Sequence, residues 1–160
     1  MLTWNATTTW WIWNSTGPGS VAAILTNSLL MTLPWLALFN VHKRLGGRFS
    51  YWIFLFCWMT FEYIHLNWEL SWPWLTLGNA FAGHPNWVQW YEFTGTSGGS
   101  LWVLLVNVLA FRQVRTYYGK QQLIRAMAWS LLAAIGLPLL ASMLVRGIRS
   151  GEAKNDSSAL

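Results

Sequence analysis

The sequence predicts an all-α protein: a polytopic transmembrane helix bundle with about four spans and an outer loop rich in Trp, Gly and Pro. Of the 160 residues, 54% are hydrophobic, 17% are aromatic and only 9% are charged, which leaves too little polar surface to cover a water-soluble globule. The apolar residues also gather in runs of the length that a helix needs to cross the hydrocarbon core. At this length we expect a single bundle over residues 1–146, with no room for a second domain.

Four apolar runs are predicted to cross the membrane as helices, each bounded by glycine or by charged residues. They cover about residues 20–39, 49–66, 98–111 and 126–145. The first is interrupted by Asn27, a few hydroxyls and Pro34, and the third is short for a span. Met1 to Trp13 is too short to span and lacks the features of a signal peptide. The tail at 147–160 is polar and rich in small residues, so we expect it to be disordered or to be the stub of a longer segment.

The basic residues predict which loops face the cytoplasm, because Lys and Arg in short loops are retained there during insertion. Of the ten Lys and Arg residues, three lie in loop 40–48 and four in loop 112–125, so both loops are predicted to be cytoplasmic. The N-terminal stretch and loop 67–98 contain neither residue type, which predicts that both face outward. The tail also carries basic residues, which the rule would retain in the cytoplasm. An outward tail agrees with the rule only if a large translocated domain follows it.

Tryptophan is concentrated in the two segments that are predicted to face outward, which hold nine of the 14 tryptophans. An aromatic belt that anchors the bundle at the headgroup level explains most of them. The 67–98 loop and the residue that follows it carry seven chain-bending residues, which suggests a folded, partly re-entrant structure that lines a site. These are Pro73, Gly78, Gly83, Pro85, Gly95, Gly98 and Gly99.

Glu62 and His65 are the ionisable pair most suggestive of function. Their spacing of three residues places them on one face of the second span, with Glu69 one further turn along. A Glu-x-x-His pair is also the metal-ligand spacing of di-iron bundles, but those require a second copy that this chain lacks, so we predict no metal. An ionisable Glu within a span indicates function. The alternative is a Glu at the membrane surface, hydrogen-bonded to nearby Trp and His side chains.

The other polar groups predict no further chemistry. Cys57 lies among Phe, Trp and Met residues, the setting of an inert packed thiol. Asn27 and Asn107 are expected to make interhelical hydrogen bonds. The net charge of +5 does not indicate nucleic-acid binding, because the basic residues form no stripe. A small transporter is disfavoured, since the spans lack paired broken helices and midplane charges.

Several stretches occur in an order that composition does not explain. Residues 62–79 read EYIHLNWELSWPWLTLGN, residues 89–95 read QWYEFTG, and residues 98–102 read GGSLW, followed by Val106-Asn107. In this order they resemble apolipoprotein N-acyltransferase of the bacterial inner membrane, particularly the versions in Bacteroidetes-type bacteria. The resemblance covers roughly Trp4 to Phe111, with a looser hydropathy match through the last span.

The resemblance implies that the chain is a multi-pass inner-membrane protein with loop 67–98 in the periplasm. The family transfers an acyl chain from a phospholipid donor to the α-amino group of the N-terminal cysteine of an apolipoprotein acceptor, and we expect no cofactor. The family's catalytic Glu, Lys and Cys belong to a nitrilase-like domain and have no counterparts here. We therefore assign no catalytic residue, expect the isolated chain to be inactive, and expect a separately encoded nitrilase-like domain as a partner.

Five residues are predicted to shape a site that positions lipid substrates beneath the catalytic domain, without a bond-making step. They are Glu62, Trp72, Trp74, Gly78 and Tyr91. Two interpretations remain open at this point. The chain is either the membrane portion of an acyltransferase, as a fragment or as half of a split enzyme, or a non-catalytic membrane binding or scaffold protein derived from the family.

Overall fold

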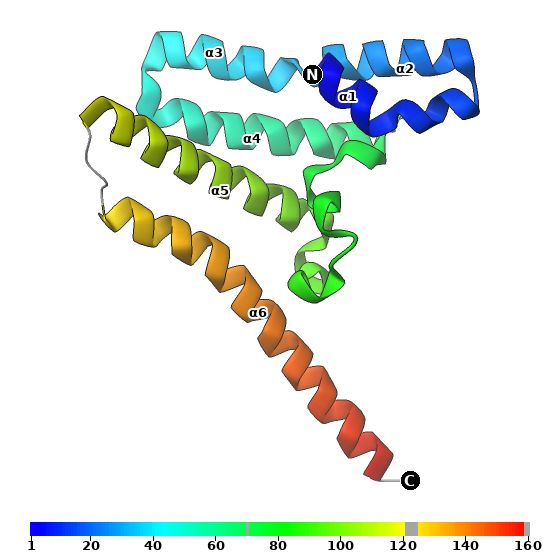
Figure 1. The fold of residues 1–160 in the computed structure, drawn as a ribbon, viewed down its shortest axis with the longest axis vertical. Coiled ribbons are helices and arrows are strands. Elements are labelled where there is room, and N and C mark those ends of the chain that lie inside the picture. The colour runs from blue at the N-terminus through cyan, green and yellow to red at the C-terminus, as the bar shows by residue number, and fades with distance from the viewer. Residues whose placement is uncertain (70, 121–124, 159–160) are drawn as a thin grey trace. The chain divides into compact units, whose positions relative to one another are not determined.

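The computed structural model describes residues 1–69, 71–120 and 125–158, and these are almost entirely helical (Figure 1). No strand occurs among the described residues, so the all-α class is confirmed. Four short 3-10 helices accompany the six α-helices. The elements in chain order are α1 (Leu2–Thr9), η1 (Trp10–Asn14), α2 (Gly17–Leu30), α3 (Leu33–Leu45), α4 (Gly47–Leu66), η2 (Pro73–Leu75), η3 (Leu77–Phe81), η4 (Pro85–Trp87), α5 (Tyr91–Lys120) and α6 (Arg125–Ser158).

Three described stretches are long and apolar enough to cross a membrane: Gly17–Leu45, Tyr91–Gly119 and Arg125–Gly151. They contain the first, third and fourth predicted spans, and the third does begin earlier than residue 98. The second predicted span corresponds to α4, which has the 20 residues that a crossing needs but is less apolar because of its Arg, Glu, His and aromatic side chains. The predicted count of four is therefore approximate.

The predicted loop boundaries need correction in three places. Residues 112–120 belong to α5 and Arg125 begins α6, and the other residues of the loop predicted at 112–125, residues 121–124, lie outside the described part. Residues 40–45 likewise belong to α3 and 91–98 to α5. Residues 147–158, expected to be disordered, continue α6. Their polar composition does not prevent helix propagation, because adding a residue to an existing helix is far easier than nucleating a new one.

The chain divides after Thr76 into two compact units, Met1–Thr76 and Leu77–Leu160. In the first unit, α3 and α4 form a hairpin that turns at Gly46, whose φ of 76° favours glycine. They run side by side in Figure 1. On α4 the buried Trp58 and Phe54 pack against Trp35 of α3, with ring centroids 6.4 and 4.8 Å from it.

The first predicted span is broken into α2 and α3 at Met31 and Thr32. Pro34 has no N–H to donate to the carbonyl of Leu30, so the helix cannot run through it unchanged. The Thr32 amide instead bonds Leu29 O at 3.0 Å, a tighter turn, and Pro34 falls in the first turn of α3, where proline is tolerated.

A buried amide pair joins α1 to α2. Asn27 Nδ2 donates to Asn5 Oδ1 at 2.5 Å, and Asn5 Nδ2 lies 3.4 Å from the sulfur of Met31. All three residues are at most 4% exposed. The predicted interhelical role of Asn27 is confirmed, whereas that of Asn107 is wrong. Asn107 is exposed and donates to Val103 O of its own helix at 2.8 Å.

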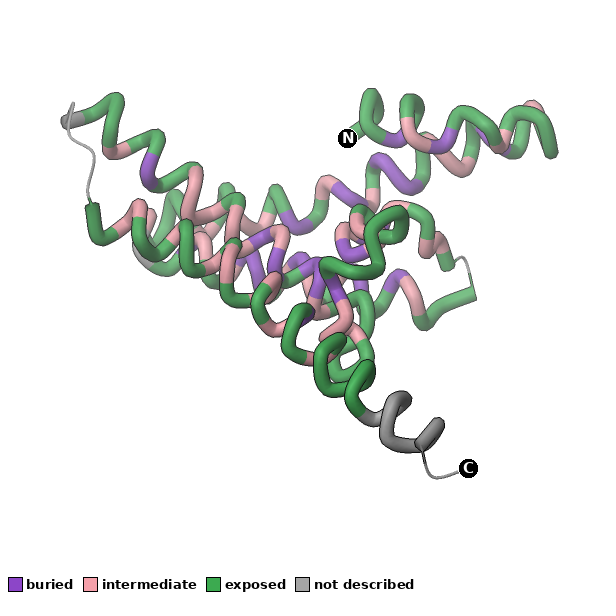
Figure 2. Tube along the Cα trace, turned by 60° about the horizontal axis from the view of Figure 1, so that its bottom comes forward, coloured by how far each residue is buried: buried purple, intermediate pink, exposed green. Residues whose placement is uncertain are grey.

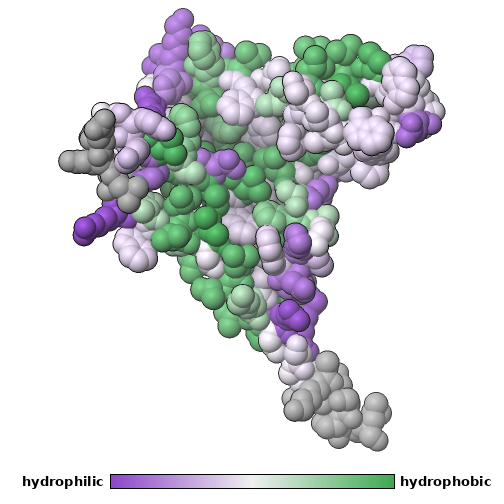
Figure 3. All heavy atoms as spheres, in the orientation of Figure 1, coloured by the Kyte–Doolittle hydropathy of each residue, from purple (hydrophilic) through white to green (hydrophobic). Residues whose placement is uncertain are grey.

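In the second unit, α6 packs on α5 and η4 and then continues beyond them. Figure 2 shows that the described part of α6 is exposed over most of its length, and Figure 3 shows apolar atoms along it before the hydrophilic atoms near its end. Ser142 Oγ is fully buried, donates to Trp87 O at 2.6 Å and accepts from Gln89 N at 3.0 Å. This one side chain ties the turn at η4 to α6.

Candidate functional site

Glu62 and His65 face the same interior of the first unit, as their spacing predicts. They are 7% and 8% exposed, respectively. Trp58 Nε1, one turn earlier on α4, donates to Glu62 Oε1 at 2.9 Å. The His65 ring stacks on Phe61 with centroids 5.1 Å apart and an interplanar angle of 18°. A hydrogen bond from a nearby tryptophan to Glu62, expected for a Glu at the membrane surface, is present, and the Glu62 side chain is buried within the unit.

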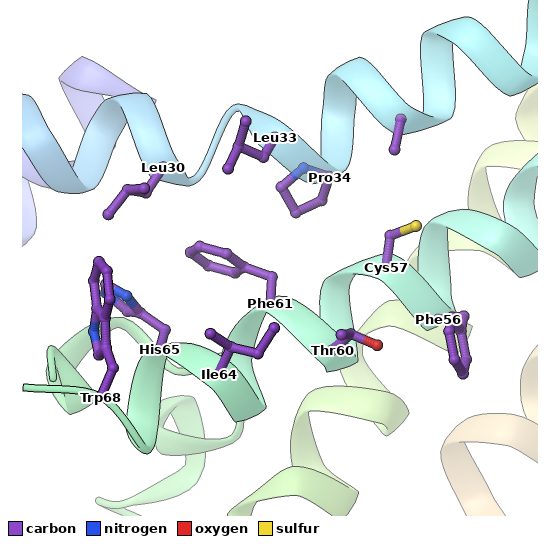
Figure 4. Close-up of a pocket in the computed structure, with 11 residues that line it drawn as sticks. Leu30, Leu33, Pro34, Phe56, Cys57, Thr60, Phe61, Ile64, His65 and Trp68 are labelled. Carbon is purple, nitrogen blue, oxygen red and sulfur yellow. The ribbon is translucent and has the colours of Figure 1, made fainter.

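An apolar groove lies between α4 and the broken α2–α3 pair and has a volume of about 370 Å³. Figure 4 shows Leu30 on the far side of the helix break from Leu33 and Pro34, with Phe61 of α4 opposite them. Three of the residues lining it, Leu33, Phe56 and Ile64, are more than half exposed. The groove is therefore open to the surroundings along its rim. Its lining is Leu30, Leu33, Pro34, Ala37, Phe56, Cys57, Thr60, Phe61, Ile64, His65 and Trp68.

A second hollow adjoins the groove and has a volume of about 440 Å³. We call it the polar recess because its lining, although mostly apolar, carries more polar groups than that of the groove. The groove and the recess share Leu30, His65 and Trp68, which form the wall between them. On one side of this wall the lining is mainly hydrocarbon, and on the other side it includes amide, hydroxyl, carboxylate and indole groups. Glu69 lines the recess from the turn after α4, where it is exposed. It does not continue the helix face of Glu62, as we had expected. The lining of the recess is Ala22, Ala23, Thr26, Asn27, Leu30, His65, Trp68, Glu69, Ser71 and Trp72.

A small polar space of about 10 Å³ lies where Asn27, Glu62, His65 and Trp72 meet, which is about the volume that one water needs. His65 lines this space, the apolar groove and the polar recess. Its Nε2 and the Nε1 of Trp72 are buried and have no hydrogen-bond partner among the described atoms. Asn27 Oδ1, which lines the same space, is likewise buried without a partner. Buried polar atoms without partners carry a desolvation cost, so this cluster of three is unusual.

The structure brings Glu62 and Trp72 together, but it gives the other three predicted site residues different surroundings. Trp74 is 58% exposed and meets the edge of Trp11 with centroids 5.5 Å apart, outside the three hollows described above. Gly78 and Tyr91 belong to the second unit and contact each other, since Tyr91 Oη donates to Gly78 O at 2.8 Å. Their observed role is to fasten η3 to α5.

Gly78 is required by close packing. Its amide donates to the buried Ser100 Oγ at 2.9 Å, and a Cβ at this position would collide with the carbonyl oxygen of Thr96. The segment then turns into the long part of α5 at Gly95, whose φ of 63° and ψ of −169° interrupt the helical backbone. Gly78 thus allows a close approach and Gly95 a sharp bend, two of the backbone roles that suit glycine.

The groove itself was not predicted from the sequence, although the sequence contains a signal for it. Cys57, Phe61, Ile64 and Trp68 recur at intervals of three and four residues, which is the pattern of one helix face. We had described Cys57 as an inert packed thiol, and the structure places it half-buried in the groove wall. Across the described residues no three His, Cys, Asp or Glu side chains gather as metal ligands would.

Comparison with known proteins gives a consistent assignment. Residues 1–109 match the family model of the apolipoprotein N-acyltransferase N-terminal domain. The chain is 30% identical over 134 residues to an apolipoprotein N-acyltransferase of Chlorobaculum tepidum, an alignment that covers 82% of this chain and 24% of that protein. The chain thus spans about a quarter of the length of this relative. No solved structure matches this chain.

Proposed function

This chain belongs to the apolipoprotein N-acyltransferase family, and from that premise we propose that it is the membrane region of such an enzyme. In this role it holds lipid acyl chains while an acyl group passes from a phospholipid to the N-terminal cysteine amine of an apolipoprotein. The observation that carries the proposal is the apolar groove of α3 and α4, which ends against the polar recess at His65 and Trp68.

The groove suits an alkyl chain for three reasons. Its volume of about 370 Å³ falls in the usual range of small-molecule sites. Its wall is almost wholly hydrocarbon and aromatic, so an alkyl chain within it leaves few polar groups unpaired. Its exposed rim residues let a chain enter sideways from a surrounding bilayer rather than from water. A polar head attached to that chain would lie in the recess.

The proposal assigns binding and positioning to this region and leaves bond-making to a nitrilase-like domain that supplies the Glu, Lys and Cys. In the proposed orientation, the hairpin end of α3 and α4 around residues 40–48 and the residues at 112–125 are cytoplasmic, and residues 67–90 are periplasmic in the bacterial inner membrane. An ion pair within the second unit supports a periplasmic position for the end of α6. Arg149, which opposed the charge rule, pairs with Glu92 at the start of α5, next to the outer loop.

The test is acyl transfer by this chain and a separately purified nitrilase-like acyltransferase domain in phospholipid vesicles with a synthetic lipopeptide acceptor. Mass spectrometry of the lipopeptide measures the transfer. We expect at least a tenfold higher rate with the chain than with the domain alone, and a loss of that gain in Ala37→Trp, which fills the groove. The matched control is Ala133→Trp, at an exposed position of α6.

Two outcomes would oppose the proposal. Equal rates with and without the chain would favour the non-catalytic binding or scaffold alternative. An equal loss of activity in Ala37→Trp and Ala133→Trp would mean that the groove has no special part in substrate use. Far-UV circular dichroism of each variant separates loss of the groove from loss of the fold.

A further inference from the structure

We propose that Trp72 and His65 bind the ester carbonyl of a membrane glycerolipid whose acyl chain occupies the apolar groove. This inference rests on the proposed function in taking a lipid as the ligand. It adds the chemical group that is recognised and the atoms that recognise it. The site is a binding site, and no covalent step occurs there.

The two ring nitrogens are the starting point. Trp72 Nε1 and His65 Nε2 are buried without hydrogen-bond partners in the described chain, whereas Trp58 Nε1 on the same helix as His65 is satisfied by Glu62 at 2.9 Å. An indole N–H can only donate, and an imidazole Nε2 donates in one of its two neutral tautomers. Both nitrogens belong to residues that line one hollow with Asn27, whose Oδ1 is likewise buried without a partner. Since no described side chain accepts from either ring nitrogen, an acceptor that enters from outside would satisfy both.

The position of the donors fixes where that acceptor lies on the ligand. Trp72 and His65 both line the polar recess, and His65 also lines the groove. In Figure 4 His65 and Trp68 stand together at one end of the groove, beyond Phe61. An acceptor held there is therefore at the start of a chain that runs along the groove past Phe61 towards Cys57. The carbonyl of an acyl ester occupies that place in a glycerolipid.

The charges nearby favour a neutral acceptor over a carboxylate. Glu62 shares the small polar space with His65 and Trp72, and Glu69 lines the recess. Neither the recess nor the small polar space has a Lys or Arg among its described lining residues. A free fatty-acid carboxylate would thus sit beside acidic groups with no cation to balance it, which is costly away from water. An ester carbonyl accepts hydrogen bonds without bringing a charge.

The experiment compares two lipids that differ only in the carbonyl group. The purified full chain in detergent is titrated with dioctanoyl phosphatidylcholine, a diester, and with its dioctyl diether analogue, and binding is measured by isothermal titration calorimetry. We expect the diester to bind about tenfold more tightly. Trp72→Phe and His65→Phe keep an aromatic ring and remove the donor, so each is expected to lose most of this preference and to retain diether binding. Trp52→Phe removes an indole N–H from a 61% exposed position on α4 and should leave the preference intact.

Each possible result bears on the inference. Equal binding of the two lipids by the unmodified chain overturns it and leaves the proposed positioning of lipid chains standing. Absence of binding to either lipid overturns the proposed function as well. A diester preference that persists in both Trp72→Phe and His65→Phe overturns the assignment of these residues. A variant that fails to fold loses diether binding too, and the comparison in the unmodified chain then decides the question.

Discussion

Replacing Trp102 with phenylalanine tests whether one side chain compensates for a proline inside α6. Pro138 has no N–H to donate to the carbonyl four residues earlier, which belongs to Ala134. The structure supplies a donor from the neighbouring helix, because Trp102 Nε1 of α5 bonds Ala134 O at 2.7 Å. In a membrane span, where water does not reach the backbone, a neighbouring helix commonly satisfies such a carbonyl.

The expected magnitude follows from this geometry. Trp102→Phe leaves the Ala134 carbonyl without that donor, which costs about 1–2 kcal/mol of stability. It also shrinks a ring that stacks on Phe81 at 4.7 Å, and this packing loss adds to the total. In a Pro138→Ala background the new amide of residue 138 can bond Ala134 O itself. The hydrogen-bond part of the loss then disappears, so the coupling between the two positions should be about 1 kcal/mol.

A double-mutant cycle separates the two parts of this loss. The four proteins are unfolded reversibly in mixed micelles by added sodium dodecyl sulfate, and helicity is followed by far-UV circular dichroism. Trp129→Phe, at a 70% exposed position of α6, controls for a general effect of removing tryptophan. If Trp102→Phe costs the same with Pro138 present as in the Pro138→Ala background, to within about 0.3 kcal/mol, the tryptophan does not replace the missing amide and the reasoning fails.

Two further predictions concern the outer loop. Gly78→Ala should destabilise the chain by at least about 2 kcal/mol in the same unfolding assay, because its Cβ collides with Thr96 O. Gly83→Ala, with nothing within 4 Å of its Cβ, should change stability little, and equal effects would contradict the packing argument. In a Cys57→Ala background, Arg44→Cys and Gly83→Cys should react with a membrane-impermeant thiol reagent from the cytoplasmic and periplasmic sides, respectively. Labelling of both from one side would refute the orientation.

The sequence predicted which segments are helical better than it predicted the residues at which each helix begins and ends. The three long apolar stretches were all recognised because hydrophobic length is a local property. The break at Thr32 was missed, although Pro34 had been noted, since a proline in an apolar run can kink a helix or begin a new one. The helical state of residues 147–158 was missed because a polar composition indicates only that a segment is not buried. It does not indicate whether a helix that has already begun continues through the segment.

The candidate site was predicted only in part. Residue order pointed to Glu62 and Trp72, and the structure places them in one hollow with His65. The same reasoning chose Gly78 and Tyr91, whose contacts in the structure fasten η3 to α5. A residue that shapes a ligand site and one that packs two backbone segments can look alike along the chain, since both are often glycine or aromatic.

The sequence by itself determined the all-α class, the apolar stretches and the family, because hydropathy, helical spacing and residue order can all be read along the chain. The tertiary structure alone decided that Leu30, Pro34 and Trp68 line one groove, and that His65 stands where this groove meets the polar recess. It also decided which buried donors have partners. These features depend on which helix faces meet, and that is set by packing between residues far apart in the chain.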